Sequence, residues 1–324
     1  MENVIVNAHV VDSRNIGDLA SSPIPYFDFD YRVETLDLRS IDPKFSVPQS
    51  GFGGSITLDE IRKTSDQVRY HLIIGGGGLL YKQFLRSYKI LESLKSVFRG
   101  HWIAWGVGQQ VYALSGEKSL IPQLSAARDG FAYQQYLSMF DLVGIRDQGF
   151  DYDWIPCASC LHPTFDKPRE PRHDVVVFSH RKFKLKLGNL PCMSHDTQSL
   201  EEVIDFLGSG KTIISSSYHG AYWGTLLGRR VVAFPFSTKF LTLKHPPVIY
   251  PIQQWNYSRF KFRPFKQGFL NRIKLEYTYG NHYTCRTQNW QATAALSQSY
   301  SDILQQYRDA NIHFYRRVLS LLSE

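Results

Sequence analysis

A chain of 324 residues is longer than one ordinary core requires and suits two domains of about 150 residues each. Its composition, with 43% hydrophobic and 20% charged residues, excludes a disordered protein, and no run reaches the ~20 apolar residues that a membrane-spanning helix needs. The formal net charge of +8 favours anionic partners, but it does not choose among phosphates, acidic sugars, nucleic acid and anionic lipid.

Apolar runs of strand length alternate with helix-period segments along the first half, which predicts βα units around a parallel sheet. The predicted strands span residues 4–9, 33–38, 71–74, 102–105 and 142–145. One helix should begin after Thr57, because this residue can cap a free amide and Glu60 can reach back to it. A second helix is predicted over 80–94. We therefore expect an N-terminal α/β domain over residues 1–150.

A polar, proline-rich stretch over residues 151–172 predicts an interdomain linker. A second alternating series over 173–295 predicts another α/β domain, with strands at 174–178, 211–215 and 230–235 and helices at 200–207 and 218–227. Residues 296–324 are expected to form one amphipathic helix that packs on a domain. Its apolar face would carry Ile303, Tyr307, Ala310, Phe314, Val318 and Leu321.

Two short motifs follow predicted strands of the first half. Asn15, Gly17 and Asp18 form an Asn-x-Gly-Asp segment after the first strand, where side chains of a parallel sheet face a ligand crevice. An ordinary turn before a helix is the alternative reading. Further on, an apolar strand runs into four glycines that include Gly76 and Gly77. Such a run is typical either of an amide cradle for an anion or of a tight strand-to-helix turn.

Three further elements carry charged or titratable groups. Arg146 and Asp147 end the last predicted strand of the first half, where they form either a plain ion pair or part of a cleft. Ser217 and His219 open a helix after one strand of the second half, and Lys239 follows the next strand. The carboxyl ends of parallel strands share one edge, so His219 and Lys239 should meet there.

In this order, these five elements resemble the polysaccharide pyruvyl transferase family, whose members carry an Asn-x-Gly-Asp segment, a glycine-rich turn, an Arg-Asp pair, a Ser/Arg-x-His helix start and a Ser-x-Lys-Phe segment. The resemblance spans nearly the whole chain. It implies two Rossmann-like domains facing a cleft, as in glycosyltransferases of the B type, with the acceptor on the first domain and the donor on the second. It also implies an enzyme that takes phosphoenolpyruvate as co-substrate and uses neither a metal nor another cofactor.

The resemblance further implies a reaction in which pyruvate passes to a saccharide as a cyclic ketal. His219 is then the general acid that protonates the donor's methylene carbon, and Asp147 is the base or acceptor-binding group. The substrate-binding residues would be Asn15, Gly17, Asp18, Gly76, Gly77, Arg146, Arg181, Lys182, Ser217 and Lys239.

One position departs from the family pattern. Many members have an arginine two residues before the histidine, where this chain has Ser217. Another cation would then hold the donor's negative charge. Arg181 and Lys182, which follow the first strand of the second half, are the natural substitutes, although a solvated basic loop explains them nearly as well.

Other functions fit parts of the sequence. A B-type glycosyltransferase that uses a nucleotide sugar needs the same fold, and a non-catalytic module for anionic polymers would need only basic charge, which is scattered here. Cys157, Cys160 and His162 could supply three zinc ligands, but a closed site needs four. A Cys/His/Asp hydrolase would lack the local context of its nucleophile.

The N-terminal segment lacks the basic region and cleavage site of a secretory signal, and four cysteines are too few for a disulfide framework. We therefore expect a cytoplasmic protein with free thiols, without a nucleic-acid partner. The sequence leaves open the acceptor sugar, the oligomeric state, and whether the acceptor is lipid-linked, which would bring the enzyme to the inner face of the plasma membrane.

Overall fold

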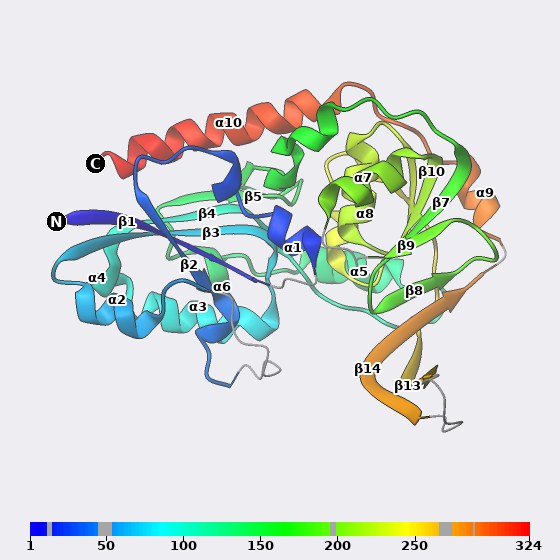
Figure 1. Cartoon of the computed structure of the whole chain (residues 1–324), viewed down its shortest axis with the longest axis horizontal. Coiled ribbons are helices and arrows are strands. Elements are labelled where there is room, and N and C mark those ends of the chain that lie inside the picture. The colour runs from blue at the N-terminus through cyan, green and yellow to red at the C-terminus, as the bar shows by residue number, and fades with distance from the viewer. Residues whose placement is uncertain (12–14, 45–53, 195–198, 266–273, 288) are drawn as a thin grey trace.

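The computed structural model describes residues 1–11, 15–44, 54–194, 199–265, 274–287 and 289–324, except the side chains of 258–282. These residues form a mixed α/β protein with one parallel sheet of six strands, another of five, and a long C-terminal helix (Figure 1). A long ribbon of two antiparallel strands extends away from the second half.

The first sheet has the strand order β2-β1-β3-β4-β5-β6, and every neighbouring pair is parallel. Its strands are β1 (Glu2–His9), β2 (Arg32–Asp37), β3 (Val68–Leu80), β4 (Arg99–Gln109), β5 (Leu142–Ile145) and β6 (Asp153–Trp154). All five predicted strands of the first half are thus present. The order reverses between β1 and β3, and such a switch point opens a crevice at the carboxyl ends of the strands.

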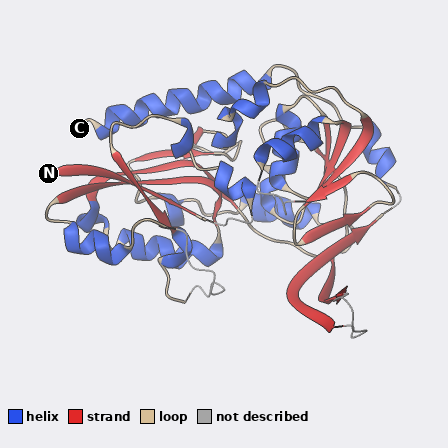
Figure 2. Cartoon of the chain, viewed as in Figure 1, coloured by secondary structure: helices blue, strands red, loops and turns tan. Residues whose placement is uncertain are grey.

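Both faces of the first sheet are buried, which explains why its strands read as continuous apolar runs. Val4 and Val6 of β1 face the cluster under α2 (Leu58–Thr64), α3 (Leu85–Glu92), α4 (Lys95–Phe98) and α6 (Gln134–Leu137). Ile5, between them, faces the other cluster, which Phe314 and Val318 of the C-terminal helix complete. Figure 2 shows helices on both sides of this sheet.

The C-terminal helix α10 (Ile303–Leu322) returns from the second half and packs across the first sheet (Figure 1). Its buried face contains Asn311 and Leu322 instead of the predicted Ala310 and Leu321. Asn311 is buried because its amide is satisfied: Oδ1 accepts a hydrogen bond from Trp105 Nε1 at 2.9 Å, and Nδ2 donates to the carbonyl oxygen of Pro156 at 3.2 Å. A separate short helix, α9 (Trp290–Ala295), precedes it.

The second sheet also has a point at which its strand order reverses. Its parallel strands have the order β12-β11-β10-β7-β9, so the order reverses between β7 and β10. They are β7 (His173–Ser179), β9 (Cys192–Ser194), β10 (Gly210–Ser215), β11 (Arg230–Ala233) and β12 (Val248–Ile249). The helices α7 (Leu200–Gly208) and α8 (Tyr218–Leu226) follow β9 and β10 in the chain.

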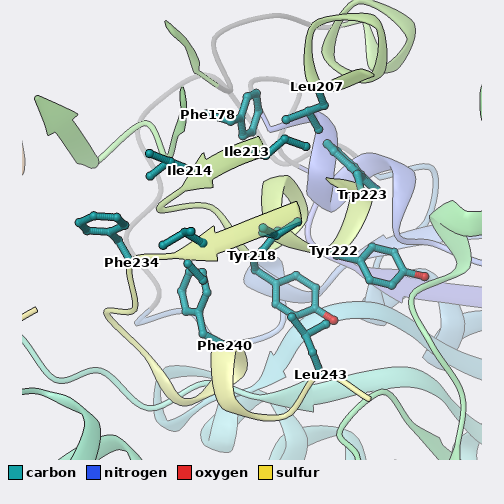
Figure 3. Packing of buried hydrophobic residues seen from close by; sticks show 14 of the residues in the cluster. Phe178, Leu207, Ile213, Ile214, Tyr218, Tyr222, Trp223, Phe234, Phe240 and Leu243 are labelled. Carbon is teal, nitrogen blue, oxygen red and sulfur yellow. The ribbon is translucent and has the colours of Figure 1, made fainter. Parts of the chain in front are cut away.

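The core of the second half combines aromatic side chains such as Phe178, Tyr222 and Trp223 with aliphatic ones such as Leu207 and Ile213 (Figure 3). Every residue of α8 is buried, because Tyr222 and Trp223 pack among Leu207, Ile213 and other side chains of the cluster. The predicted helix boundaries are confirmed here to within one residue: Ser217 caps the start, and Gly228 follows the end with φ of 65°.

The two halves exchange segments. Helix α5 (Ile121–Asp129) belongs to the first half in sequence, yet its Leu124 lies in the core of the second half. The segment before it is bound there through its backbone, since Ala113 N donates to Phe236 O at 3.1 Å and Trp255 N donates to Leu114 O at 2.9 Å. In the opposite direction, α10 packs on the first sheet. Each half therefore contributes a segment that packs on the other half.

The remaining elements are short or belong to the separate three-stranded sheet β13-β14-β8. They are α1 (Ile16–Ala20), β8 (Phe183–Lys186), β13 (Asn256–Phe265), β14 (Lys274–Arg286) and the 3₁₀ turns η1 (Ile24–Tyr26), η2 (Leu38–Ser40), η3 (Lys82–Phe84), η4 (Ala158–Leu161), η5 (Pro163–Asp166) and η6 (Thr238–Leu241). Within the described ranges, we find no helix with the length and apolar character needed to cross a bilayer.

The glycine run differs from its prediction. Strand β3 continues through all four glycines to Leu80, a 3₁₀ turn follows, and α3 begins only at Leu85. The pairing with β4 is irregular between Gly77 and Leu80, and Gly76 and Gly77 have φ of 74° and 96°. Glycine tolerates such angles, so the strand bends instead of giving way to a helix. No helix start lies directly after the glycines to cradle an anion.

Candidate functional site

Loops that follow strands of both sheets enclose a small cavity of about 40 Å³, which we call the inner cavity. Six of the side chains predicted for the site line it: Asn15, Asp18, Arg146, Ser217, His219 and Lys239. They follow the carboxyl ends of β1, β5, β10 and β11, and β1 and β10 each flank a switch point. Open α/β sheets bind ligands at this position.

His219 lies directly against the glycine of the first motif. Its side chain is 6% exposed, and a Cβ atom added to Gly17 would lie only 2.1 Å from His219 Nδ1. Any side chain at position 17 would therefore displace the imidazole or the short helix α1. The first motif and the start of α8, about 200 residues apart in the chain, therefore pack directly against each other.

Two other side chains contact the imidazole. Trp223 stacks on His219 with 4.9 Å between ring centroids, and Cys157 Sγ lies 3.8 Å from His219 Nε2. Burial raises the pKa of the Cys157 thiol, so the thiol is protonated at neutral pH. Because the thiolate is the nucleophilic form, Cys157 serves as a neighbour that orients the ring and not as a nucleophile.

Arg146 is a buried cation with unused hydrogen-bonding capacity. Its side chain is 3% exposed, and its guanidinium carbon lies 4.0 Å from the ring centroid of Tyr218. Its Nε and Nη2 atoms have no hydrogen-bond partner among the residues that the structure describes. A buried charged group of this kind is costly unless its donors are satisfied. Arg146 also lines the inner cavity, so an anion there would lie beside this guanidinium.

Asp147 points away from the cavity and ties three segments together. Its Oδ2 accepts hydrogen bonds from Gln109 N at 2.6 Å and Tyr133 Oη at 2.9 Å, and its Oδ1 accepts one from Thr242 Oγ1 at 2.7 Å. Burial raises the pKa of its carboxyl group, which the charge of Arg146 and these hydrogen bonds oppose. Asp147 is 1% exposed and lines neither cavity. This geometry favours an anchoring role over the predicted role as a base.

Lys239 is half-buried on η6 between two aromatic rings. Its Nζ lies 5.0 Å and 6.0 Å from the ring centroids of Phe236 and Phe240, and 3.5 Å from Gln110 Oε1. Burial, followed by the charge of Arg146, lowers the pKa of the Lys239 ammonium to about 7, while Asp18 acts in the opposite direction. This amine can therefore gain or lose a proton near neutral pH.

The serine run before α8 mainly serves the backbone. Ser217 Oγ accepts a hydrogen bond from Gly220 N at 3.2 Å and caps the helix. Ser216 Oγ donates to Phe183 O at 2.5 Å and accepts from His180 N at 3.0 Å, so it joins the loops after β7 and β10. Position 217 is buried, and Arg146 lies over the ring of the next residue, Tyr218. Arg146 thus lies beside the residue that follows position 217, where the resemblance would place an arginine.

A larger cavity of about 470 Å³, the outer cavity, adjoins the inner one. Arg181 and Lys182 line the outer cavity and not the inner one. The two cations predicted to replace the family arginine therefore lie near the site, but on its open side. Their location suits an anionic group on a second, larger ligand.

Aromatic side chains form much of the outer cavity's wall. The ring centroid of Tyr112 lies 5.5 Å from that of Tyr81 and 6.4 Å from that of Phe183, and Phe183 stacks on Tyr283 at 4.7 Å. Tyr112 is 38% exposed, so its ring is available to a ligand. Flat apolar walls among polar groups are typical of sites for ring-shaped polar ligands.

Of the four glycines of β3, only Gly78 lines a cavity. A Cβ atom there would lie 2.4 Å from Gln110 Oε1 and 3.2 Å from Arg146 Nη2. Gly76 instead makes room for a backbone carbonyl, since its Cβ would lie 1.9 Å from Ser21 O. Gly77 lines neither cavity. In place of the predicted ligand contacts, Gly76 makes room for packing and Gly77 has a positive φ, and Gly78 approaches the site.

Sequence reasoning missed four lining residues: Gln110, His180, Tyr218 and Gly78. Gln110 follows β4 immediately after Gln109, where the rule that ligands bind after strands could have located it. His180 directly precedes Arg181 and Lys182, and only these two cations of the segment were predicted to bind substrate. Tyr218 carries no recognisable signal, because its role is to lie under Arg146.

The cysteine segment does not converge on one point. Cys157 Sγ approaches His219, Cys160 Sγ accepts a hydrogen bond from Asn311 Nδ2 at 3.5 Å, and His162 Nδ1 accepts one from Thr164 N at 3.2 Å. Within the described part of the chain, no cluster of three or more His, Cys, Asp or Glu residues has the arrangement of a metal site.

Comparison with known proteins gives little further information. No family model matches the chain, and no curated protein matches it. A crystal structure of an uncharacterized protein from Klebsiella pneumoniae subsp. pneumoniae is similar with a TM-score of 0.38 and 14% sequence identity, over 72% of this chain and 83% of that one.

Proposed function

We propose that this protein transfers pyruvate from phosphoenolpyruvate to a pair of saccharide hydroxyls, as polysaccharide pyruvyl transferases do. One observation carries the proposal. Four motifs that are far apart in sequence, represented by Asp18, Arg146, His219 and Lys239, line one cavity. Their order along the chain and their convergence in space are independent of each other, and both agree with the resemblance.

The architecture proposed with it is that of two Rossmann-like halves facing a cleft, as in B-type glycosyltransferases. Each parallel sheet reverses its strand order at a switch point, and the residues after both switch points line the same cavity. A C-terminal helix that returns to the first half is part of this proposed arrangement. The acceptor would occupy the outer cavity and the donor's anionic end the inner one.

The size of the inner cavity supports this division. A buried water occupies roughly 10–15 Å³ by the same kind of measure, so about 40 Å³ holds a group of a few non-hydrogen atoms. A phosphate or carboxylate has this size, whereas a sugar ring or a nucleoside does not. Arg146 supplies the unsatisfied donors that such an anion requires.

The chemistry assigned to the site begins with a proton. His219 donates a proton to the methylene carbon of phosphoenolpyruvate, which makes the adjacent carbon electrophilic. A saccharide hydroxyl in the outer cavity attacks that carbon, the bond to the phosphate oxygen breaks, and a second hydroxyl closes the ketal. Arg146 remains with the departing phosphate. Asp147 holds the end of β5 so that Arg146 keeps its place.

The test is to incubate the full chain with ¹³C-labelled phosphoenolpyruvate and a panel of saccharides, and to follow phosphate release and label incorporation by mass spectrometry. We expect labelled pyruvate on at least one saccharide. Matched reactions with nucleotide sugars test the rival glycosyltransferase. Glycosyl transfer from a nucleotide sugar, without any binding of phosphoenolpyruvate, would contradict the proposal.

A further inference from the structure

The inner and outer cavities share a boundary that few groups occupy. Five residues line both cavities: Asn15, Asp18, Gln110, His180 and Lys239. If the donor's anion fills the inner cavity and the saccharide fills the outer one, the new carbon–oxygen bonds form at this boundary. His219 lines only the inner cavity, so it can reach the donor but is poorly placed to take a proton from the acceptor.

Three of these boundary residues can exchange protons. Asp18 Oδ2 accepts a hydrogen bond from Asn15 Nδ2 at 2.6 Å, and His180 Nδ1 accepts one from Lys182 N at 3.1 Å. Each thus has one proton-accepting atom already engaged. Lys239 Nζ approaches Gln110 Oε1 at 3.5 Å and lies over the ring of Phe236.

We propose that Lys239, as a neutral amine, is the base that takes the proton from the attacking saccharide hydroxyl. The inference deepens the proposed function and rests on it. It assigns to Lys239 the task that sequence reasoning gave to Asp147, whose oxygens are engaged in anchoring hydrogen bonds. It also changes the role of Lys239 from a fixed cation for the donor to a group that changes its charge during the reaction.

The electrostatic environment supports this role. The charged and titratable groups around Lys239 are Arg146 after β5, Asp18 on α1, His219 on α8, and His180, Arg181 and Lys182 after β7. Burial and the Arg146 charge lower the pKa of the Lys239 amine to about 7, so a large fraction of it is neutral at cellular pH. A base with a pKa near the working pH transfers protons most effectively.

The protons balance over one turnover. His219 gives one proton to the methylene carbon, and the first hydroxyl gives one to Lys239 as its oxygen bonds to the neighbouring carbon. Lys239 then passes that proton to phosphate as the carbon–oxygen bond to phosphate breaks. The second hydroxyl attacks in turn and gives its proton to Lys239, which is neutral again. Lys239 then releases this proton to solvent, and His219 takes up one proton from solvent. The products are the pyruvate ketal and hydrogen phosphate.

The decisive comparison is between Lys239→Arg and Lys239→Gln. Arginine keeps the positive charge but does not deprotonate near neutral pH. If Lys239 is the base, both variants lose about a hundredfold or more in kcat and also lose the limb of the pH profile near 7. Phosphoenolpyruvate should still bind to Lys239→Arg with a Kd within about threefold of the parent, because Arg146, which is assigned to the donor's anion, is unchanged.

A second measurement does not depend on the acceptor. Acetylation of the lysines by acetic anhydride is followed by peptide mass spectrometry from pH 5 to pH 10, with the exposed Lys118 as internal reference. We expect the reactivity of Lys239 to rise with a midpoint near 7 and to be protected by phosphoenolpyruvate. Lys118→Gln serves as the matched control variant and should leave kcat unchanged.

The outcomes separate the two proposals. Near-parental kcat in Lys239→Arg, or a midpoint for Lys239 that coincides with that of Lys118, would overturn the assignment of the base while phosphoenolpyruvate binding remains. A parent protein that binds no phosphoenolpyruvate would instead overturn the proposed function, and the base assignment with it. Circular dichroism of both variants shows whether loss of kcat reflects loss of the fold.

Discussion

The inner and outer cavities adjoin, yet they are built in opposite ways. The inner cavity is small and lined by charged or titratable groups such as Arg146 and His219, which are buried and held by stacking contacts. The outer cavity is more than ten times larger and is walled by aromatic rings and exposed cations such as Lys182. A buried, preorganised region suits chemistry on a small anion, whereas an open aromatic region suits recognition of a larger partner.

The difference predicts where substitutions will affect the reaction. Changes in the inner cavity should alter turnover or donor binding, because its groups are desolvated and have few replacements. Changes at residues that line only the outer cavity should alter mainly the acceptor's constants, since exposed contacts contribute less and water can replace them.

The largest effect is expected for His219→Gln. Glutamine preserves much of the volume against Trp223 but cannot donate a proton in the same way, so transfer should fall by about 10²- to 10⁴-fold. The measurement is kcat for pyruvate transfer, with the thermal midpoint of unfolding as the check on the fold. Near-normal turnover in this variant would remove His219 from the mechanism.

Gly17→Ala should cause the next largest loss of turnover, although residue 17 has no side chain that takes part in the reaction. The new Cβ would lie 2.1 Å from His219 Nδ1, so the imidazole must move. We expect a loss of about tenfold to a hundredfold in kcat, because a misplacement of 1 Å costs as much, and a loss of about 1–3 kcal/mol of stability from overpacking.

Gly130→Ala is the matched control for Gly17→Ala. It ends α5 away from both cavities, and its nearest contact would be Ala126 O at 3.3 Å. Parental kinetics in Gly17→Ala would show that the close contact with His219 is not needed for activity.

Cations in the two cavities should differ in their effect on the donor. Arg146→Met removes a buried guanidinium, and a charge-assisted hydrogen bond contributes about 1.5–3 kcal/mol, so the Kd of phosphoenolpyruvate should rise tenfold to a hundredfold. Arg181→Ala should raise it much less, because Arg181 lines only the outer cavity. Calorimetric titration of phosphoenolpyruvate into both variants measures which Kd rises more. A larger rise in Arg181→Ala would restore the predicted role of Arg181 as the donor's cation.

The smallest effect is expected for Tyr112→Ala. Loss of one aromatic wall should weaken the acceptor by about 1 kcal/mol, which raises its KM roughly fivefold and leaves the donor's Kd unchanged. Tyr31→Ala, in the first half beside α10, is the control for removal of a tyrosine elsewhere. An altered donor Kd in Tyr112→Ala would mean that the two cavities do not divide the substrates as proposed.

Local rules explain which parts of the fold were readable from sequence. A capping residue placed the start of α2, where Thr57 Oγ1 accepts from Glu60 N, and the structure shows the same contact at the start of α7, from Glu202 N to Ser199 Oγ. Apolar runs located the strands, because a strand of a sheet that is buried on both faces has apolar side chains on both sides. The glycine run was misread, since its bend depends on Ser21 and on the pairing with β4, neither of which is local.

The sequence by itself determined the α/β character, the order of the elements and the residues that follow the strands, because each depends on neighbours within a few positions. Only the tertiary structure decided what those residues do. Asp147 became an anchor because Tyr133 and Thr242 reach its carboxylate, whereas its neighbour Arg146 was left with unsatisfied donors beside a cavity. Burial and nonlocal charge set these roles, and a linear pattern contains neither.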